Sequence, residues 1–169
     1  MEKKLTKQEF GKIIKDWLEK FLVNKYGKDY DIISIDFPAR TLNLLNNNEI
    51  KKVKNISFFS FKPDLVGILK NKRSGSVELV IINRELRSIG LRELGEMQCY
   101  CRLAKPFLAM WFSLQGLAGP IDRLINHNKK EGILEYNDKK IIILRWDNFK
   151  KQIDKFSITP VEYRNFILS

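Results

Sequence analysis

The sequence predicts an α/β protein in which helices cover a mixed central sheet. Three observations predict it: an amphipathic helix opens the chain, short apolar strands follow, and helical patterns recur between the later strands. Strands without polar alternation are buried on both faces, so helices should pack on both sides of the sheet. With 169 residues, no internal repeat and no linker, we expect residues 1–169 to form a single domain.

Residues 6–26 show the clearest helical pattern. Thr6 and Glu9 have the spacing of a capping box, and Gly27 is a suitable helix stop. Between them, apolar residues recur at the i, i+3 and i+4 positions of one helix face: Phe10, Ile13, Ile14, Trp17, Leu18, Phe21 and Leu22. The sequence therefore predicts an N-terminal helix with one buried stripe.

The first half of the chain also predicts four strands, at residues 30–37, 56–61, 64–69 and 77–83. Pro38 ends the first of them. Residues 41–54 include three consecutive asparagines and are predicted to form a loop or a ragged hairpin.

The second half predicts a helix that ends before Pro106 and a buried strand after it, at residues 91–103 and 107–114. A further helix is expected at residues 120–128. A C-terminal hairpin and helix should then span about 133–156: strands at 133–136 and 140–146, and a last helix that begins at Asp147 and carries Phe149, Ile153 and Phe156.

The charge balance favours a polyanionic partner. Lys and Arg number 31 against 20 Asp and Glu, which gives a formal net charge of +11. Such a surplus promotes contact with nucleic acid through phosphate neutralisation and counterion release. The alternative is a charge that serves solubility only.

Cysteine content and hydropathy predict a cytoplasmic protein. Cys99 and Cys101 lie two apart on a predicted helix, so they face different sides and should not form a disulfide. The chain shows no secretory signal pattern, and its apolar runs are far shorter than the roughly 20 residues of a membrane span. We therefore expect no membrane association.

Several kinds of site are excluded by pattern. A single histidine, His127, cannot build a site that needs several imidazole ligands. The sequence contains no Gly-rich phosphate loop, no nucleophile elbow and no zinc-ligand spacing.

The polar residues at two neighbouring strand ends do carry a chemical pattern. Asp64 opens one strand directly after Pro63, and the next strand ends in the run Asn83-Arg84-Glu85-Leu86-Arg87. Neighbouring strands can bring Asp64 and Glu85 together at one edge of the sheet. Two carboxylates there could hold Mg²⁺ or Mn²⁺, which would polarise a phosphodiester, and a nearby Lys or Arg would stabilise the charge that develops.

Residues 61–66 and 78–85 together resemble the motif of the PD-(D/E)XK nuclease superfamily. Residues 94–106 resemble the helix that follows this motif, where a Gln and a Tyr four residues apart face the active site; Glu96 and Tyr100 hold those places here. The resemblance covers about residues 56–115. It implies a restriction-endonuclease-like sandwich and metal-dependent hydrolysis of DNA, often by a homodimer.

The motif departs from the family pattern in two alternative registers. Aligned by the apolar run, the acidic position is Asn83 and the lysine position is Glu85. Shifted by two residues, Glu85 becomes the acid and Arg87 stands for the lysine. Both registers keep the same strand face, so periodicity does not choose between them.

Residues outside the motif could also complete the site. Lys62 lies on the same strand face as Asp64 and could supply the cation, and Glu96 could supply a carboxylate. The candidate catalytic residues are therefore Asp64, Glu85, Arg87 and Lys62, and the candidate metal ligands are Asp64, Glu85, Asn83 and Glu96.

Candidate nucleic-acid contacts lie on the same segments. They are Arg84, Arg92, Lys70, Lys72, Arg73 and Tyr100, for which ordinary surface or core positions are the alternative. The leading expectation is a metal-dependent nuclease-fold protein that acts on DNA. A non-catalytic nucleic-acid-binding or assembly module with a degenerate site is the second, and a small basic protein that binds another protein is the third.

Overall fold

The computed structural model describes residues 5–169 as an α/β protein with a mixed, strongly curled sheet of six strands. The described residues form four α-helices: α1 Lys7–Tyr26, α2 Leu91–Ala104, α3 Gly119–Asp122 and α4 Arg164–Leu168. The sheet has the order β1-β2-β3-β4-β7-β8. Its strands are β1 Tyr30–Asp36, β2 Leu65–Asn71, β3 Val77–Glu85, β4 Leu108–Ser113, β7 Ile142–Asp147 and β8 Gln152–Ile153. The predicted α/β class and mixed sheet are confirmed.

The chain divides into two compact units, each described by itself. The first comprises Met1–Ile82 and Pro106–Leu108, and the second comprises Asn83–Lys105 and Ala109–Ser169.

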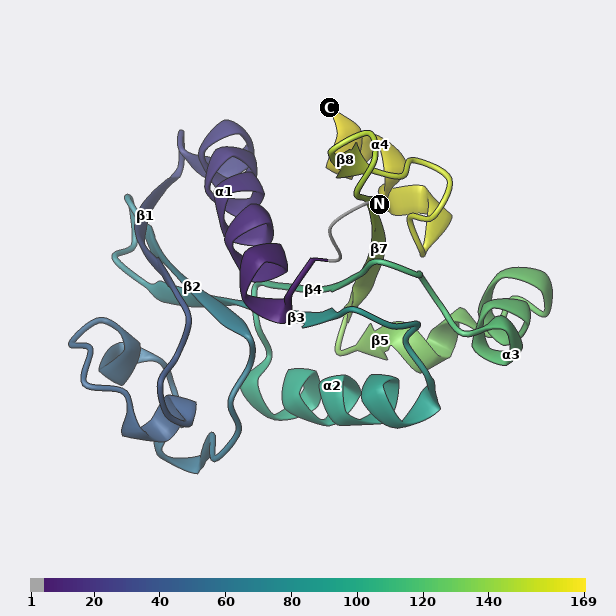
Figure 1. The fold of residues 1–169 in the computed structure, drawn as a ribbon. Helices are drawn as coiled ribbons and strands as arrows, with labels where there is room; N and C mark the ends of the chain where they lie inside the picture. The colour runs from purple at the N-terminus through teal and green to yellow at the C-terminus, as the bar shows by residue number, and fades with distance from the viewer. Residues whose placement is uncertain (1–4) are drawn as a thin grey trace. The chain divides into compact units, whose positions relative to one another are not determined.

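In the first unit, α1 and the antiparallel strands β1 and β2 lie side by side (Figure 1). The predicted capping box is present, and the side chains of Phe10, Ile14 and Leu18 are completely buried. Gly67 on β2 permits close packing, since a Cβ there would lie 3.7 Å from Leu22 Cδ1 and 3.1 Å from Val80 Cβ. The apolar stripe of α1 thus packs on strands that carry apolar side chains of their own.

One strand predicted for the first unit is wrong. Residues 56–61 do not form a strand: Asn55 adopts a left-handed conformation, and Ile56–Phe58 forms a 3₁₀ turn. Phe59 and Phe61 are nevertheless buried, and their carbonyl oxygens accept hydrogen bonds from the Asn43 and Leu42 amides. Of the two alternatives predicted for residues 41–54, the structure shows the loop, which contains two short 3₁₀ helices, Leu42–Leu44 and Ile50–Lys52.

In the second unit, β4 and β7 are parallel neighbours with Ser113 paired to Arg145. The predicted helix at 120–128 is present as α3 followed by a π-helical turn at Arg123–His127. A short hairpin, β5 Glu135–Tyr136 and β6 Lys139–Lys140, precedes β7.

The last predicted helix, from Asp147 to Phe156, is absent. Asp147 Oδ1 accepts hydrogen bonds from the Phe149 and Lys150 amides, but the turn that it caps stops at Lys151, whose φ is 53°. The chain then forms β8. Because Phe149 and Phe156 are both exposed, these residues present no continuous apolar stripe that a helix would bury.

The capping box of α1 allows a test of how much the start of this helix contributes to stability. Thr6 Oγ1 accepts from the Glu9 amide at 3.1 Å, and Glu9 Oε2 accepts from the Thr6 amide at 2.9 Å. We expect Thr6→Ala to lower the free energy of unfolding by about 1 kcal/mol in urea denaturation. Lys12→Ala, on the exposed side of the same helix, is the control and should change it by less than about 0.5 kcal/mol. Equal losses in both variants would contradict the role of the cap.

Candidate functional site

Asp64 and Lys62, two of the predicted catalytic residues, both belong to the first unit. Asp64 immediately precedes β2 and is 22% exposed, and the Lys7 ammonium lies 3.4 Å from its Oδ1. Lys62 instead donates to the carbonyl oxygen of Ala39 at 3.2 Å. The cation beside Asp64 is therefore Lys7.

Lys7 was not predicted as a functional residue. It is the first residue of α1, directly after the capping threonine, and such positions are ordinary surface in most helices. No sequence signal links it to a residue 57 positions away, and only the packing of α1 on the strands brings them together.

The polar run after the apolar part of β3 belongs to the second unit. Asn83 is 8% exposed, Arg84 and Glu85 are half-buried, and Arg87 is exposed. The Glu85 carbonyl accepts from the Leu114 amide at 3.2 Å, and the Arg87 carbonyl accepts from Ser113 Oγ at 2.6 Å. The backbone of this run is thus fixed against the residues that follow β4.

Glu96 and Tyr100 on α2 contact each other. The Tyr100 hydroxyl donates a short hydrogen bond to Glu96 Oε1. Burial raises the pKa of Tyr100, and the hydrogen bond to Glu96 raises it further. Both side chains lie in the second unit, whereas Asp64 lies in the first.

The basic residues predicted to contact nucleic acid differ in whether their side chains already have partners within the protein. Lys72 donates to the Gly27 carbonyl at 2.6 Å and lies 3.7 Å from Asp31, and Lys70 lies 4.0 Å from Glu49. Arg73 and Arg92 are exposed. Within the turn at residues 70–73, Arg73 therefore presents the cation best placed for an external phosphate.

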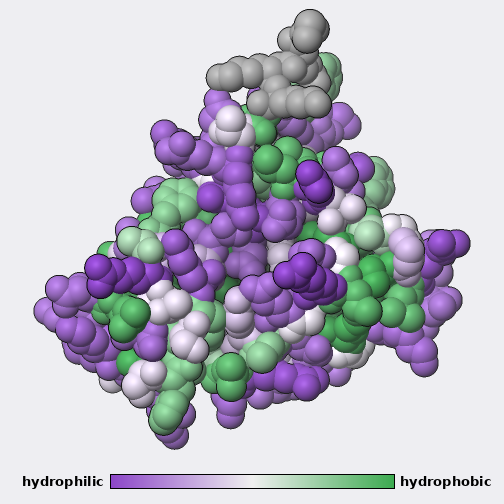
Figure 2. Space-filling view, turned by 60° about the horizontal axis from the view of Figure 1, so that its bottom comes forward, coloured by the Kyte–Doolittle hydropathy of each residue, from purple (hydrophilic) through white to green (hydrophobic). Residues whose placement is uncertain are grey.

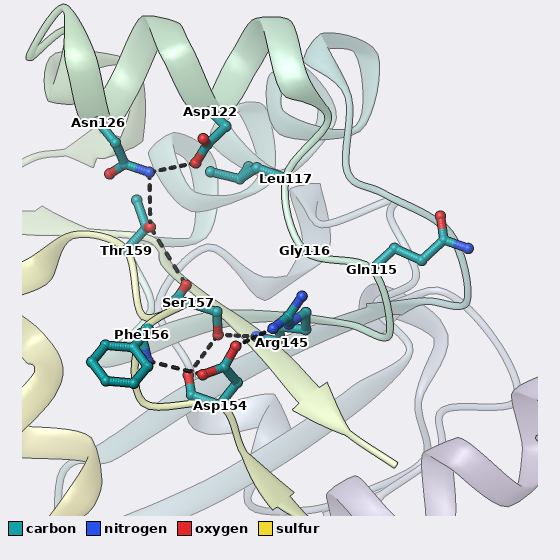
Figure 3. Close-up of a pocket in the computed structure, with 10 residues that line it drawn as sticks. All are labelled: Gln115, Gly116, Leu117, Asp122, Asn126, Arg145, Asp154, Phe156, Ser157 and Thr159. Atoms are coloured by element: carbon teal, nitrogen blue, oxygen red, sulfur yellow. Dashed lines mark hydrogen bonds and ion pairs between the residues drawn. The ribbon is translucent and has the colours of Figure 1, made fainter. Parts of the chain in front are cut away.

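A pocket that the sequence did not predict lies wholly within the second unit. Its volume is about 320 Å³, and we call it the C-terminal pocket. Figure 3 shows the ten residues that line it: Gln115, Gly116, Leu117, Asp122, Asn126, Arg145, Asp154, Phe156, Ser157 and Thr159. They come from the loop after β4, from α3 and its π-helical extension, from β7, and from the segment after β8.

Ser113 organises the loop on one side of the C-terminal pocket. Its hydroxyl is fully buried and accepts from the amides of Gln115 and Gly116, both at 2.9 Å. Gly116 has a φ of 77°, which a glycine adopts without strain. A Cβ at this position would lie 3.7 Å from Arg145 Cδ, so the loop backbone runs close to the arginine side chain.

An ion pair forms another side of the pocket. Arg145 Nη2 donates to Asp154 Oδ2, while Asp154 Oδ1 accepts from the Phe156 amide at 3.0 Å (Figure 3). Burial raises the pKa of Asp154, but these hydrogen bonds and the charge of Arg145 outweigh burial and hold the pKa below its ordinary value. Asp154 is thus held as a carboxylate and fixes the backbone at Phe156.

The helical side of the pocket carries an amide beside a carboxylate. Asn126 Nδ2 donates to Asp122 Oδ1 at 2.7 Å and to Thr159 Oγ1 at 3.4 Å (Figure 3). This geometry fixes Asn126 with its amide donors engaged, so its carbonyl oxygen and the second Asp122 oxygen provide acceptors.

Among residues 5–169, no group of three or more His, Cys, Asp or Glu side chains is arranged to hold a metal ion. No helix in this part of the chain is long and apolar enough to cross a bilayer. No protein-family model, curated protein or solved structure matches the chain.

The Arg145–Asp154 pair predicts how stability depends on pH. The pKa of Asp154 is lower in the folded than in the unfolded protein. The ionised Asp154 therefore stabilises the fold fully above about pH 4, and this stabilisation is lost as the pH falls through the pKa of the folded state. We expect Asp154→Asn to lower the free energy of unfolding by about 1 kcal/mol at neutral pH. The variant should also lose less stability than the wild type when the pH is lowered. Urea denaturation across a pH series measures both effects.

Asp138→Asn, in the exposed β5–β6 turn, is the matched control and should leave stability unchanged. A variant at Asp154 that is as stable as the wild type at neutral pH would show that the ion pair contributes nothing.

Proposed function

We propose that this chain is a DNA-binding protein that keeps a restriction-endonuclease-like fold and carries a divergent, non-catalytic motif. The observation that carries the proposal of DNA binding is the formal net charge of +11. The face of the molecule in Figure 2 is mostly hydrophilic, with separate apolar patches, which agrees with a solvated surface available to a polyanion.

The order of elements supports the proposed fold family. One helix, three antiparallel strands, a second helix and a further strand follow one another as α1, β1, β2, β3, α2 and β4. Asp64 directly precedes β2, Asn83–Glu85 ends β3, and Glu96 and Tyr100 lie on the next helix. These are the places that the resemblance assigns to the motif.

The side chains in those places fit a divalent cation poorly. In the register aligned by the apolar run, Asn83 offers a neutral amide oxygen where a carboxylate is expected, and hard cations favour charged oxygen ligands. The Lys7 ammonium lies 3.4 Å from Asp64 Oδ1, where its positive charge would repel a divalent cation. The donor set therefore favours binding without hydrolysis.

Metal-dependent hydrolysis of DNA is the second candidate. Asp64 directly precedes β2, and Glu85 is the last residue of β3; these are the places that the resemblance gives to the two acidic residues. In this alternative Asp64 and Glu85 would be the metal ligands.

DNA binding should depend on salt and on Arg73. We expect a short duplex to bind at low ionic strength, with the logarithm of the affinity falling linearly as the logarithm of the salt concentration rises. Arg73→Ala should reduce the slope by about one, because one phosphate contact is lost. Fluorescence anisotropy at several salt concentrations gives the slope.

Lys52→Ala removes the same charge, but its ammonium already pairs with Glu49 at 2.7 Å, so it is the control and should change the slope little. If the wild type shows no affinity for DNA at low salt, the proposed function is wrong.

Cleavage assays separate the two candidates. We expect the purified protein to leave plasmid, linear duplex and single-stranded DNA intact with Mg²⁺ or Mn²⁺, and Asp64→Asn to behave identically. Calorimetry with Mn²⁺ should show no binding heat. Cleavage by the wild type that Asp64→Asn abolishes would establish the second candidate instead.

A further inference from the structure

The C-terminal pocket lies where α/β proteins commonly bind ligands. Strands β4 and β7 are parallel, with Ser113 and Arg145 paired near their carboxyl ends. The loop that follows Ser113 and the side chain of Arg145 both line the pocket. Ligands of open α/β sheets bind in crevices outside the carboxyl ends of the strands. A volume of about 320 Å³ is at the small end of ligand sites, roughly 300–1,000 Å³, and suits one compact group.

The chemistry of the lining argues for a polar, uncharged occupant. Two carboxylates, Asp122 and Asp154, line the pocket with one guanidinium, Arg145, which pairs with Asp154. Such a lining repels a phosphate. It does offer acceptors at Asp122 and Asn126 to amino and imino donors, as on the edge of a nucleobase. Carboxylates accept from the exocyclic amino group of cytosine in this way.

Phe156 provides a flat apolar surface at the rim. It lines the pocket while 74% of its surface is exposed, and its backbone is held by the hydrogen bond from its amide to Asp154. Exposed aromatic rings that are fixed in this way are stacking platforms for unpaired bases.

Two cations lie over this ring, within cation–π distance. Lys155 Nζ is 4.9 Å and Arg164 Cζ is 5.8 Å from the Phe156 ring centroid, so a base that stacks on the ring displaces them toward its flanking phosphates. Lys150 is also close enough to act on the charge of Asp154. Positive charge therefore surrounds the rim of a pocket whose interior is not basic, which suits a ligand with a neutral heterocycle and an adjoining phosphate.

We propose that the C-terminal pocket binds one unpaired base of single-stranded DNA. Phe156 stacks on the base, Asp122 and Asn126 accept hydrogen bonds from its edge, and Lys155 and Arg164 contact the flanking phosphates. This inference rests on the proposed DNA binding and names its substrate class as single-stranded DNA with amino-bearing bases.

The test compares Phe156→Leu with wild type on three labelled probes of equal length, about twelve nucleotides. They are oligodeoxycytidine, an abasic strand with the same phosphates, and a mixed-sequence duplex, and the affinity of the 169-residue chain for each is measured by fluorescence anisotropy. Loss of one base stack, about 1–3 kcal/mol, should weaken oligodeoxycytidine binding roughly tenfold or more. Affinity for the abasic strand and the duplex should not change.

Phe149→Leu is the matched control, because Phe149 is an exposed aromatic residue of the same unit, 83% accessible, that does not line the pocket. It should bind all three probes as the wild type does. Asp122→Asn provides a second variant and should reduce the preference for oligodeoxycytidine over oligothymidine, since thymine lacks an amino group.

The outcomes separate this inference from the proposed function. If wild type and Phe156→Leu bind oligodeoxycytidine equally while DNA still binds with a salt-dependent affinity, the pocket inference is wrong and the proposed function stands. An equal loss on all three probes would also overturn it, because the base would then not matter. No DNA binding by the wild type would overturn both.

Discussion

The fold depends on the burial of strands that carry apolar side chains on both faces. Residues 65–69 of β2, 79–82 of β3, 108–112 of β4 and 142–144 of β7 are all buried. Such strands leave no room for polar groups within their length, because a buried polar group without a partner costs free energy. Polar chemistry is therefore displaced to the strand ends, where Asp64, Asn83 and Ser113 lie. Both places discussed as functional sites follow from this constraint.

The same constraint explains which elements the sequence could predict. The stripe of α1, the runs of β2, β3 and β4, and the helix at 91–104 were found because each shows a strong local pattern of burial. Residues 56–61 have strand-like composition, yet Phe59 and Phe61 are buried by a loop whose carbonyls bond to Leu42 and Asn43. The apolar composition of this segment correctly indicates that Phe59 and Phe61 are buried, but it does not indicate which backbone groups they bond to.

The C-terminal error has a different cause. Asp147 does cap a turn, as its position after an apolar strand suggested, but a cap fixes only the first turn of a helix. Propagation needs an apolar stripe to bury, and only Ile153 of the three residues expected to form one is buried. Instead, Ile153 pairs with Trp146 of β7 in an antiparallel arrangement, and this segment forms the strand β8.

Contacts between candidate residues could be expected from the sequence only where the residues lie close together along the chain. Glu96 and Tyr100, four residues apart on one helix, do contact each other. The partner of Asp64 and the lining of the C-terminal pocket are set by contacts between segments far apart in sequence, which no local pattern encodes. Asp122, Arg145 and Asp154 look like ordinary surface charges until β4 and β7 align the loops that carry them.

The distribution of charge indicates that general DNA binding and binding of an unpaired base depend on different interactions. A large net positive charge attracts any nucleic acid through its phosphates and carries no sequence information. The C-terminal pocket has the opposite character, because its guanidinium is already paired with Asp154 and its helical side offers acceptors at Asp122 and Asn126. Such a lining cannot add to phosphate affinity, so any contribution that it makes to DNA binding has to come through a base. Strand separation would then cost least at sites where the bases are already unpaired, which is why single-stranded DNA is the form that this arrangement favours.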